Sequence, residues 1–387
     1  MVDFIFENPA KIIFGKSALS HLGEEVKRYS DKVLLVYGGG SIQKIGLYDQ
    51  VLQILKECGA AVWELSGIVP NPLLSRVYEG IALCKEHDIG LILAVGGGSV
   101  IDTAKGIANG VCYDGDVWDF YTFKEVPKEA LPLGTVLTIP AAGSEMSYSS
   151  VITNENGMIK NGFNALTNVP RFSILNPEYS FTLPPYQIAC GCVDILAHMM
   201  ERYFTSVENV VLTDAMLEAC MRTVIDQAPI TLKNPEDYNA RAEVMWAGSL
   251  AHNTLLQTGR IGDWASHRMD HELGALYDLA HGAGLAIMFP AWMKYVLPRG
   301  LKKLKQFAVN VLKVPEDFGT DEAVAQEGIR RMEDFYRSIG MPVRLSEAGI
   351  APDRLEEMAK RALWRGPLGD LVLIEQADAL EIFKLAV

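Results

Sequence analysis

The chain has 387 residues, of which 49% are apolar and 21% are charged, as in an ordinary globular protein with room for two hydrophobic cores. Its formal net charge of −13 disfavours nucleic acid and anionic membrane surfaces as partners, because both carry negative charge. No apolar run reaches the roughly 18–20 residues of a membrane span.

The six cysteines and the N-terminus predict a cytoplasmic protein. The N-terminal residues lack the basic and apolar segments of a signal peptide, so we expect none. The cysteines are widely spaced in a chain too long to need disulfides, and we expect reduced thiols. They are Cys58, Cys84, Cys112, Cys190, Cys192 and Cys220.

The first half of the chain alternates apolar strands with helices. Near-continuous Val/Ile/Leu strands separated by helices predict a parallel sheet with helices on both faces. We also expect a hairpin with a two-residue turn at Asn156-Gly157. The expected strands are residues 32–37, 60–65, 91–95, 133–139 and 172–175, with the hairpin strands at 150–153 and 158–163.

From Pro184 onward, strand-like runs give way to segments with a period of 3.6 residues, which predict helices. Prolines punctuate residues 176–184, so we place the domain boundary there. The expected fold is an α/β domain, residues 1–180, followed by an all-α domain, residues 181–387. The main expected helices are 186–204, 209–227, 235–257, 282–296, 301–311 and 321–339, and two shorter ones, 352–362 and 376–385, close the chain.

A glycine turn, Gly96-Gly97-Gly98-Ser99, follows one strand and opens a helix. Glycines allow close approach to a phosphate, and the helix N-terminus attracts its negative charge. Ser99 is expected to cap the helix, with Asp102 completing a capping box. The usual dinucleotide and P-loop fingerprints both fail here. The turn therefore predicts phosphate binding without naming the nucleotide, and a tight turn with no ligand is the alternative.

A second glycine turn, Gly38-Gly39-Gly40-Ser41, ends an earlier strand. No acidic residue follows that strand to bind ribose hydroxyls and repel a 2′-phosphate. The hydroxyl of Ser41 and nearby Lys44 favour NADP(H) over NAD(H). The alternative is that Lys44 is simply solvated.

The histidines point to a metal. The chain has seven, and five of them lie between positions 198 and 281. Asp194 and His198 are four residues apart, which places both on one helix face. A carboxylate with imidazoles suits Fe²⁺ or Zn²⁺. Taken alone, Asp194 and His198 could instead be a surface pair, or His198 a buried structural histidine, without a metal.

Together these segments resemble the iron-dependent (group III) alcohol dehydrogenase family. The resemblance covers nearly the whole chain and includes residues 96–105, Thr-Ile-Pro-Ala-Ala-Gly-Ser-Glu at 138–145, Asp194-x3-His198 and His267-x3-His271-x9-His281. The turn at 37–41 looks most like the branch of butanol dehydrogenases and NADPH-dependent aldehyde reductases. Residues 141–144 depart from the commoner family pattern, and the comparison with that pattern implies that a hydroxyl near the nicotinamide is missing.

The resemblance implies a role for each matching residue. Asp194, His198, His267 and His281 match the metal ligands. From its position one helical turn from His267, His271 is expected to line the pocket or relay a proton, with orientation of a ligand as the alternative. Asp270 and Asp263 are weaker candidates for orienting a ligand. Cofactor contacts are expected at Gly38, Gly39, Ser41, Asn71, Gly97, Gly98, Ser99, Asp102, Thr138, Ser147 and Lys160.

The predicted function is therefore metal-dependent NAD(P)H reduction of small aliphatic aldehydes, and the reverse oxidation of primary alcohols, in a homodimer. The first 180 residues would bind the dinucleotide in a Rossmann-like fold, and residues 181–387 would bind the metal. A glycerol-dehydrogenase-like polyol oxidoreductase and a dehydroquinate-synthase-like lyase are the alternatives. A lyase acting on sugar phosphates would need several Lys or Arg residues around its substrate, and few lie between 194 and 281. A non-enzymatic binding protein would need a defective metal quartet or glycine turn.

Overall fold

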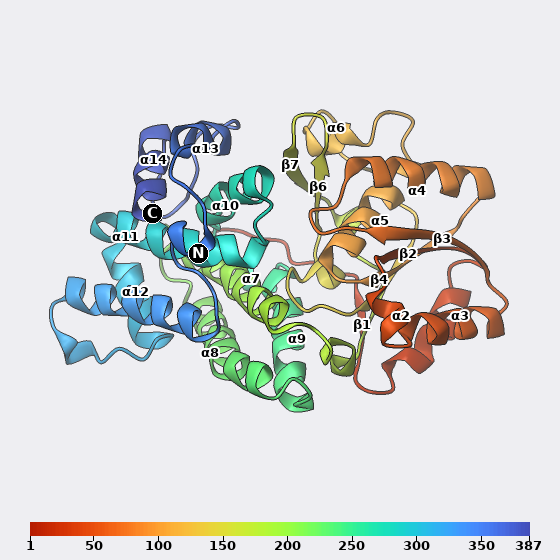
Figure 1. The fold of residues 1–387 in the computed structure, drawn as a ribbon, viewed down its shortest axis with the longest axis horizontal. Coiled ribbons are helices and arrows are strands. Elements are labelled where there is room, and N and C mark those ends of the chain that lie inside the picture. Colours follow the sequence, from red (N-terminus) through yellow and green to blue (C-terminus); the bar gives the residue numbers. More distant parts are fainter. The chain divides into compact units, whose positions relative to one another are not determined.

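The first half of the chain forms a six-stranded parallel sheet in the computed structural model, which describes residues 1–387 (Figure 1). The strand order is β1-β8-β5-β4-β2-β3. The strands are β1 (Lys11–Phe14), β2 (Lys32–Gly38), β3 (Ala61–Ile68), β4 (Leu91–Gly96), β5 (Leu133–Leu137) and β8 (Phe172–Leu175). Strand β1 was not predicted, because a run of only four half-exposed residues at a sheet edge carries no strong pattern.

Helices cover both faces of this sheet. They are α1 (Leu22–Lys27), α2 (Ser41–Lys44), α3 (Leu47–Glu57), α4 (Leu74–His87) and α5 (Gly98–Val111), and the short α6 (Trp118–Tyr121) follows them in the chain. Alternate residues of β2, such as Val33 and Leu35, pack with Val26 of α1 and Val51 of α3 in one core cluster. Helices α4 and α5 pack together on the opposite face (Figure 1). The predicted α/β fold with both faces covered is confirmed.

A separate antiparallel hairpin, β6 (Ser149–Asn154) and β7 (Ile159–Asn164), follows β5. The expected two-residue turn is wrong, because Asn154 pairs with Ile159 and leaves a four-residue loop. Within that loop Gly157 and Met158 adopt positive φ values of 89° and 48°. The side chain of Asn154 accepts the N–H of Asn156, which stabilises the wider turn.

The second half of the chain is helical, as predicted. Its helices are α7 (Pro185–Tyr203), α8 (Val211–Lys233), α9 (Tyr238–His252), α10 (Ala265–Tyr277), α11 (His281–Asn310), α12 (Asp321–Ser338), α13 (Leu355–Ala362) and α14 (Gln376–Leu385). Almost every residue of α7 from Ile188 onward is buried, and it packs against α8 and α11. Helix α7 is therefore the central helix of this part of the chain.

Two helix boundaries differ from the prediction. Helix α9 ends at His252 and not at 257, because Thr254 takes a left-handed conformation (φ 73°) before a short 3-10 turn. The two helices predicted over 282–311 form one kinked helix, α11, in which only Gly300 leaves helical geometry. No helix is long and apolar enough to cross a membrane.

The chain folds into two compact units. The sheet unit contains Glu7–Leu183 and Gly248–Asn253. The helical unit contains Met1–Phe6, Pro184–Ala247 and Thr254–Val387. The last turn of α9 thus belongs to the sheet unit, where Ser249 donates to the Glu145 carboxylate at 2.5 Å.

Candidate metal centre and dinucleotide turns

Helix α7 carries the first two residues of the predicted metal site. Asp194 and His198 lie one turn apart, and Nδ1 of His198 is 3.5 Å from Oδ1 of Asp194. Each side chain is only 6% exposed. A carboxylate in such an apolar setting requires a compensating positive charge or a metal ion.

The other two predicted ligands come from α10 and from the first residue of α11. Nε2 of His281 lies 3.5 Å from Oδ1 of Asp194, and Nε2 of His267 lies 4.0 Å from the same oxygen. One donor atom from each of these three residues lies within 4.8 Å of the others. Donors around a tetrahedral ion with bonds of about 2.0–2.1 Å are about 3.4 Å apart, so a small inward movement would complete the shell.

His198 lies against the same carboxylate but is not one of those three residues. Its ring centroid is 4.8 Å from that of His267. The structure therefore brings the three predicted imidazole ligands around Oδ1 of Asp194, and the donor atoms of Asp194, His267 and His281 form one compact group.

The chemistry of the cluster fits a divalent cation. Nε2 of His267 is buried and has no hydrogen-bond partner. A buried nitrogen without a partner is costly, and a coordinated ion would satisfy it. Three imidazoles and one carboxylate are the donor types that Fe²⁺ and Zn²⁺ accept.

Two buried carboxylates contact the far side of the imidazoles. Oε1 of Glu201 accepts from Nδ1 of His267 at 2.8 Å and from its backbone N–H at 2.9 Å. Oδ2 of Asp270 accepts from Nδ1 of His281. Sequence reasoning missed Glu201, although its position seven residues after Asp194 places it on the same face of α7.

The turn that leads into α10 is shaped around Glu201. Trp264 adopts a left-handed conformation (φ 62°), and its N–H donates to Oε2 of Glu201. Arg202 stacks its guanidinium 4.8 Å from the centre of the Trp264 ring and donates to the carbonyl of His198 at 2.7 Å. Asp263, the other carboxylate considered, instead accepts backbone N–H groups of Ala265, Asp370 and Leu371.

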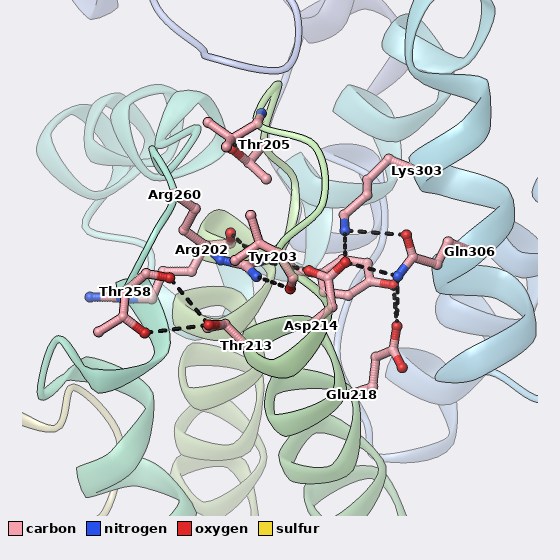
Figure 2. A network of polar contacts seen from close by, with 12 residues as sticks. Arg202, Tyr203, Thr205, Thr213, Asp214, Glu218, Thr258, Arg260, Lys303 and Gln306 are labelled. Carbon is pink, nitrogen blue, oxygen red and sulfur yellow. Dashed lines mark hydrogen bonds and ion pairs between the residues drawn. The ribbon is translucent and has the colours of Figure 1, made fainter. Parts of the chain in front are cut away.

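A buried polar network packs at the C-terminal end of α7 (Figure 2). Arg260 pairs with Asp214 at 2.8 Å and donates to the backbone carbonyls of Arg202 and Val210. Lys303 of α11 pairs with Asp214 at 2.6 Å. These bonds tie α7, α8 and α11 together through paired charges. Tyr203 and Gln306 also donate to the Glu218 carboxylate, and the Thr213 hydroxyl donates to the Thr258 carbonyl.

His271 lies one turn beyond His267 on α10. Its ring centroid is 6.1 Å from that of His281, and it is half-buried. This placement puts a titratable group beside the metal cluster without making it a member of that cluster.

The two glycine turns lie at the same edge of the sheet. Strands β2 and β4 are parallel neighbours, with Tyr37 opposite Val95, so both turns follow the carboxyl ends of adjacent strands. Gly38, Gly39 and Ser41 belong to one turn, and Gly97, Gly98 and Ser99 to the other. Ligands of open parallel sheets bind at such an edge, where the strand order reverses.

Close packing explains the glycines of the second turn. A Cβ on Gly97 would lie 3.0 Å from the Ile139 side chain, and one on Gly98 would lie 3.1 Å from Ala142. The expected cap by Ser99 is wrong, because α5 begins at Gly98 with Gly97 as a cap that has no side chain. The first N–H groups of α5 are therefore not occupied by a serine hydroxyl.

Asp102 does not complete a capping box either. Its carboxylate accepts from the Ser144 hydroxyl at 2.5 Å and from the N–H of Val151 at 3.0 Å. Burial raises the pKa of this carboxyl. Asp102 thus attaches the hairpin and the 3-10 turn at Ser144–Met146 to α5.

The remaining predicted cofactor residues lie at three places in the sheet unit. Asn71 and Lys160 are brought together, with Nζ of Lys160 3.0 Å from Oδ1 of Asn71. The Thr138 N–H donates to the Gly96 carbonyl, so that residue lies beside the second glycine turn. Ser147 is buried, and its hydroxyl accepts the N–H of Ser149 at 2.9 Å.

Comparison with known proteins defines the class. Residues 9–177 match the model for iron-containing alcohol dehydrogenases, and residues 188–387 match the C-terminal model of the Fe-containing alcohol dehydrogenase family. The chain belongs to the iron-containing alcohol dehydrogenase family, which confirms the resemblance seen in the sequence.

Individual relatives are similar over the full length. The chain is 47% identical to the probable NADH-dependent butanol dehydrogenase 2 of Bacillus subtilis (strain 168), with 99% of each chain covered. It is 37% identical to the NADPH-dependent aldehyde reductase YqhD of Escherichia coli (strain K12), with 93% of each covered. The crystal structure of NADH-dependent butanol dehydrogenase A from Thermotoga maritima matches with a TM-score of 0.96 and 39% identity, covering 100% of this chain and 99% of that one.

Proposed function

We propose that this protein is a metal-dependent NAD(P)H alcohol dehydrogenase and aldehyde reductase for small aliphatic aldehydes and primary alcohols of the butanol type. The observation that carries the proposal is the convergence of Asp194, His267 and His281 from three helices, with His198 against the same carboxylate. The full-length relatives named butanol dehydrogenase and aldehyde reductase support the substrate class.

The four side chains would hold one divalent ion, Fe²⁺ or Zn²⁺. When bound, such an ion supplies Lewis-acid polarisation of a substrate oxygen, and the nicotinamide supplies the hydride. Asp194 contributes one negative charge, and the three imidazoles contribute none when neutral. The ligand set therefore leaves net positive charge at the site, where a developing alkoxide needs it.

The sheet unit would hold the dinucleotide. Backbone N–H groups of Gly97, Gly98 and Ser99 at the start of α5 suit the pyrophosphate. The Lys160 ammonium offers a further polar contact beside Asn71, and Thr138 adds a hydroxyl next to the second glycine turn. We assign Asp102 and Ser147 to the same region, where both also support the hairpin.

The first glycine turn favours NADP(H) over NAD(H), because no acidic side chain follows β2 and Ser41 and Lys44 lie in the turn. The relatives are named for both cofactors. Titration with each reduced cofactor decides the preference. The proposal expects tighter binding of NADPH, and tighter binding of NADH would reverse it.

His271 is proposed as a pocket residue that exchanges a proton with the substrate oxygen. Its half-buried position beside His281 supports this role. A His271→Gln variant should lower kcat and change the shape of its pH profile while the metal content stays the same. An unaltered profile would remove His271 from the proton path.

A polyol oxidoreductase or a lyase is not favoured, since the full-length relatives carry alcohol dehydrogenase and aldehyde reductase names. Oxidation of NADPH with butyraldehyde, followed by the absorbance of the reduced nicotinamide, tests the activity. The rate should vanish with a chelator and return with Fe²⁺ or Zn²⁺. Unchanged turnover in a His267→Ala variant would contradict the ligand assignment.

We further propose a cytoplasmic homodimer. The six cysteines form no disulfide in the structure, which suits a reducing compartment. Light scattering during size-exclusion chromatography tests the dimer, and a monomer mass would refute it. Cell fractionation tests the compartment.

A further inference from the structure

The two imidazoles that lie on α10 and α11 are each hydrogen-bonded to a carboxylate from the preceding helix of the cluster. Glu201 of α7 accepts from Nδ1 of His267, and Asp270 of α10 accepts from Nδ1 of His281. Both carboxylates are 1% exposed. The His267–Glu201 contact is therefore enclosed, whereas the His281 side chain that bonds to the buried Asp270 is 27% exposed.

The spacing along each helix explains how this arrangement arises. Asp194, His198 and Glu201 occupy positions i, i+4 and i+7 on α7 and so share one face. His267 and Asp270 are three residues apart on α10. Helix α7 thus contributes Asp194 and His198 to the metal cluster, and its Glu201 bonds to His267 of α10. Helix α10 contributes His267, and its Asp270 bonds to His281 of α11.

We propose that Glu201 and Asp270 are positioning residues that fix the tautomer and orientation of the two histidines. A carboxylate can only accept, so Nδ1 must carry the hydrogen in both rings. Each Nε2 then keeps its lone pair and points toward Asp194, at 4.0 Å for His267 and 3.5 Å for His281. This inference rests on the proposed metal centre, because it concerns how that centre is held ready.

Glu201 is not replaceable by an amide of the same shape. Its two oxygens accept three N–H groups: the backbone N–H of Trp264, the backbone N–H of His267 and Nδ1–H of His267. A glutamine has one acceptor oxygen and an NH₂ group. In either orientation of the amide, its NH₂ group faces at least one of these three N–H groups, and two donors cannot hydrogen-bond to each other.

Gly284 makes room for the second carboxylate. A Cβ at position 284 would lie 1.7 Å from Oδ1 of Asp270. The space beside Asp270 therefore depends on a glycine in the first turn of α11. A Gly284→Ala change would displace the Asp270 carboxylate without altering its chemistry, and it provides a test independent of charge.

The affinity for metal tests the proposal in the full-length protein. Zn²⁺ dissociation constants, measured by competition with a chromophoric chelator, should rise about 10–100-fold for Glu201→Gln and Asp270→Asn, the usual cost of losing such a partner. Glu218→Gln is the matched control, because Glu218 is a buried carboxylate that accepts from Tyr203 and Gln306 and contacts no ligand. The Zn²⁺ affinity of the Glu218→Gln variant should match that of the unaltered protein.

The imidazole tautomers provide a second test, because they would not change if Glu201 and Asp270 only stabilised the fold. Metal-free protein labelled with ¹⁵N-histidine would be measured by NMR well above the usual histidine pKa of about 6.5. His267 and His281 should both show protonated Nδ1. In Glu201→Leu only His267, and in Asp270→Leu or Gly284→Ala only His281, should shift toward the other tautomer. Leucine is used for this readout because it offers Nδ1 no acceptor, whereas the amide oxygen of Gln or Asn still could.

The outcomes separate this inference from the proposed function. Unchanged tautomers and unchanged Zn²⁺ affinity in the variants would overturn the positioning roles while leaving the metal centre intact. Failure of the unaltered protein to bind Zn²⁺ would overturn the metal centre, and the tautomers of the metal-free protein would still decide the positioning roles. If one variant does not fold, the tautomer shift in the others decides.

Discussion

Nζ of Lys160 on β7 lies 3.0 Å from Oδ1 of Asn71, in the loop before α4. Asn71 adopts a left-handed conformation with φ of 52°. The N–H of Thr153 also donates to the carbonyl of Pro72 at 2.8 Å, so the hairpin is attached to this loop at two points. Two predicted cofactor contacts that lie far apart in the sequence therefore form one polar group.

A Lys160→Met variant should bind NADPH about tenfold or more weakly, because a hydrogen bond to a charged group contributes roughly 1.5–3 kcal/mol. Its thermal stability should change little. Quenching of tryptophan fluorescence by the cofactor measures the affinity. Lys124→Met is the matched control, since Lys124 pairs with Asp119 at the surface. Equal affinities for both variants would remove Lys160 from the cofactor site.

An Asp102→Asn variant should lose roughly 1–3 kcal/mol of stability. Asp102 accepts from the Ser144 hydroxyl and the Val151 N–H, and an amide leaves one buried donor without an acceptor. Urea unfolding followed by circular dichroism measures the loss. A variant of full stability with impaired cofactor binding would show that Asp102 contacts the dinucleotide and does not anchor the hairpin.

The buried Lys105 should make the folding stability depend on pH in the alkaline range. Burial lowers its pKa from 10.5 to about 8, although Nζ donates to the carbonyls of Ser147 and Ser149. Between those two values the unfolded chain retains the proton that the folded protein has released. The unfolded state then binds more protons, so the contribution of Lys105 to stability rises with pH across this window.

The measurement compares the stability of the unaltered protein with that of Lys105→Met at several pH values. The difference should move in favour of the lysine protein by up to about 3 kcal/mol between pH 8 and pH 10.5. The comparison cancels the titration of all other groups that the substitution leaves in place. A difference independent of pH would mean that Lys105 keeps its proton in the folded protein.

An Asp214→Asn variant should be destabilised by about 3 kcal/mol, since it removes the carboxylate that pairs with the buried Arg260 and with Lys303 (Figure 2). Because Asp214 contacts no predicted ligand, the Zn²⁺ affinity of the folded variant should remain unchanged. Chemical denaturation and chelator competition give the two values. A large loss of Zn²⁺ affinity with normal stability would instead link the network directly to the metal centre.

The sequence indicated those parts of the candidate site in which ligand-type residues have a helical spacing or are clustered along the chain. The four-residue interval places Asp194 and His198 on one helix face, and the clustering of histidines indicates a metal. The choice of His267 and His281 as ligands came from the family resemblance. Glu201 was missed because one glutamate on a helix resembles any solvated charge. Its role depends on the backbone of Trp264 and His267, which only the fold brings to it.

The fold was predictable where a regular pattern of apolar residues extended over a whole strand or a long helix. The strands β2 and β4 and the long helices of the second half were found from their patterns. The helix capped in the prediction by Ser99 begins two residues earlier, with Gly97 as its cap, at a position where a Cβ would lie 3.0 Å from the Ile139 side chain. Asp102 was likewise placed by tertiary contacts with Ser144 and Val151, which outweigh its local preference to cap.

X-ray absorption spectroscopy of the purified protein tests the central claim most directly, because it identifies the bound metal and its ligands together. The account predicts a single divalent iron or zinc ion per chain with nitrogen and oxygen ligands at about 2.0–2.2 Å. It also predicts loss of that signal in an Asp194→Ala variant that remains folded. An unchanged spectrum in the Asp194→Ala variant, or sulfur ligands around the ion, would contradict it.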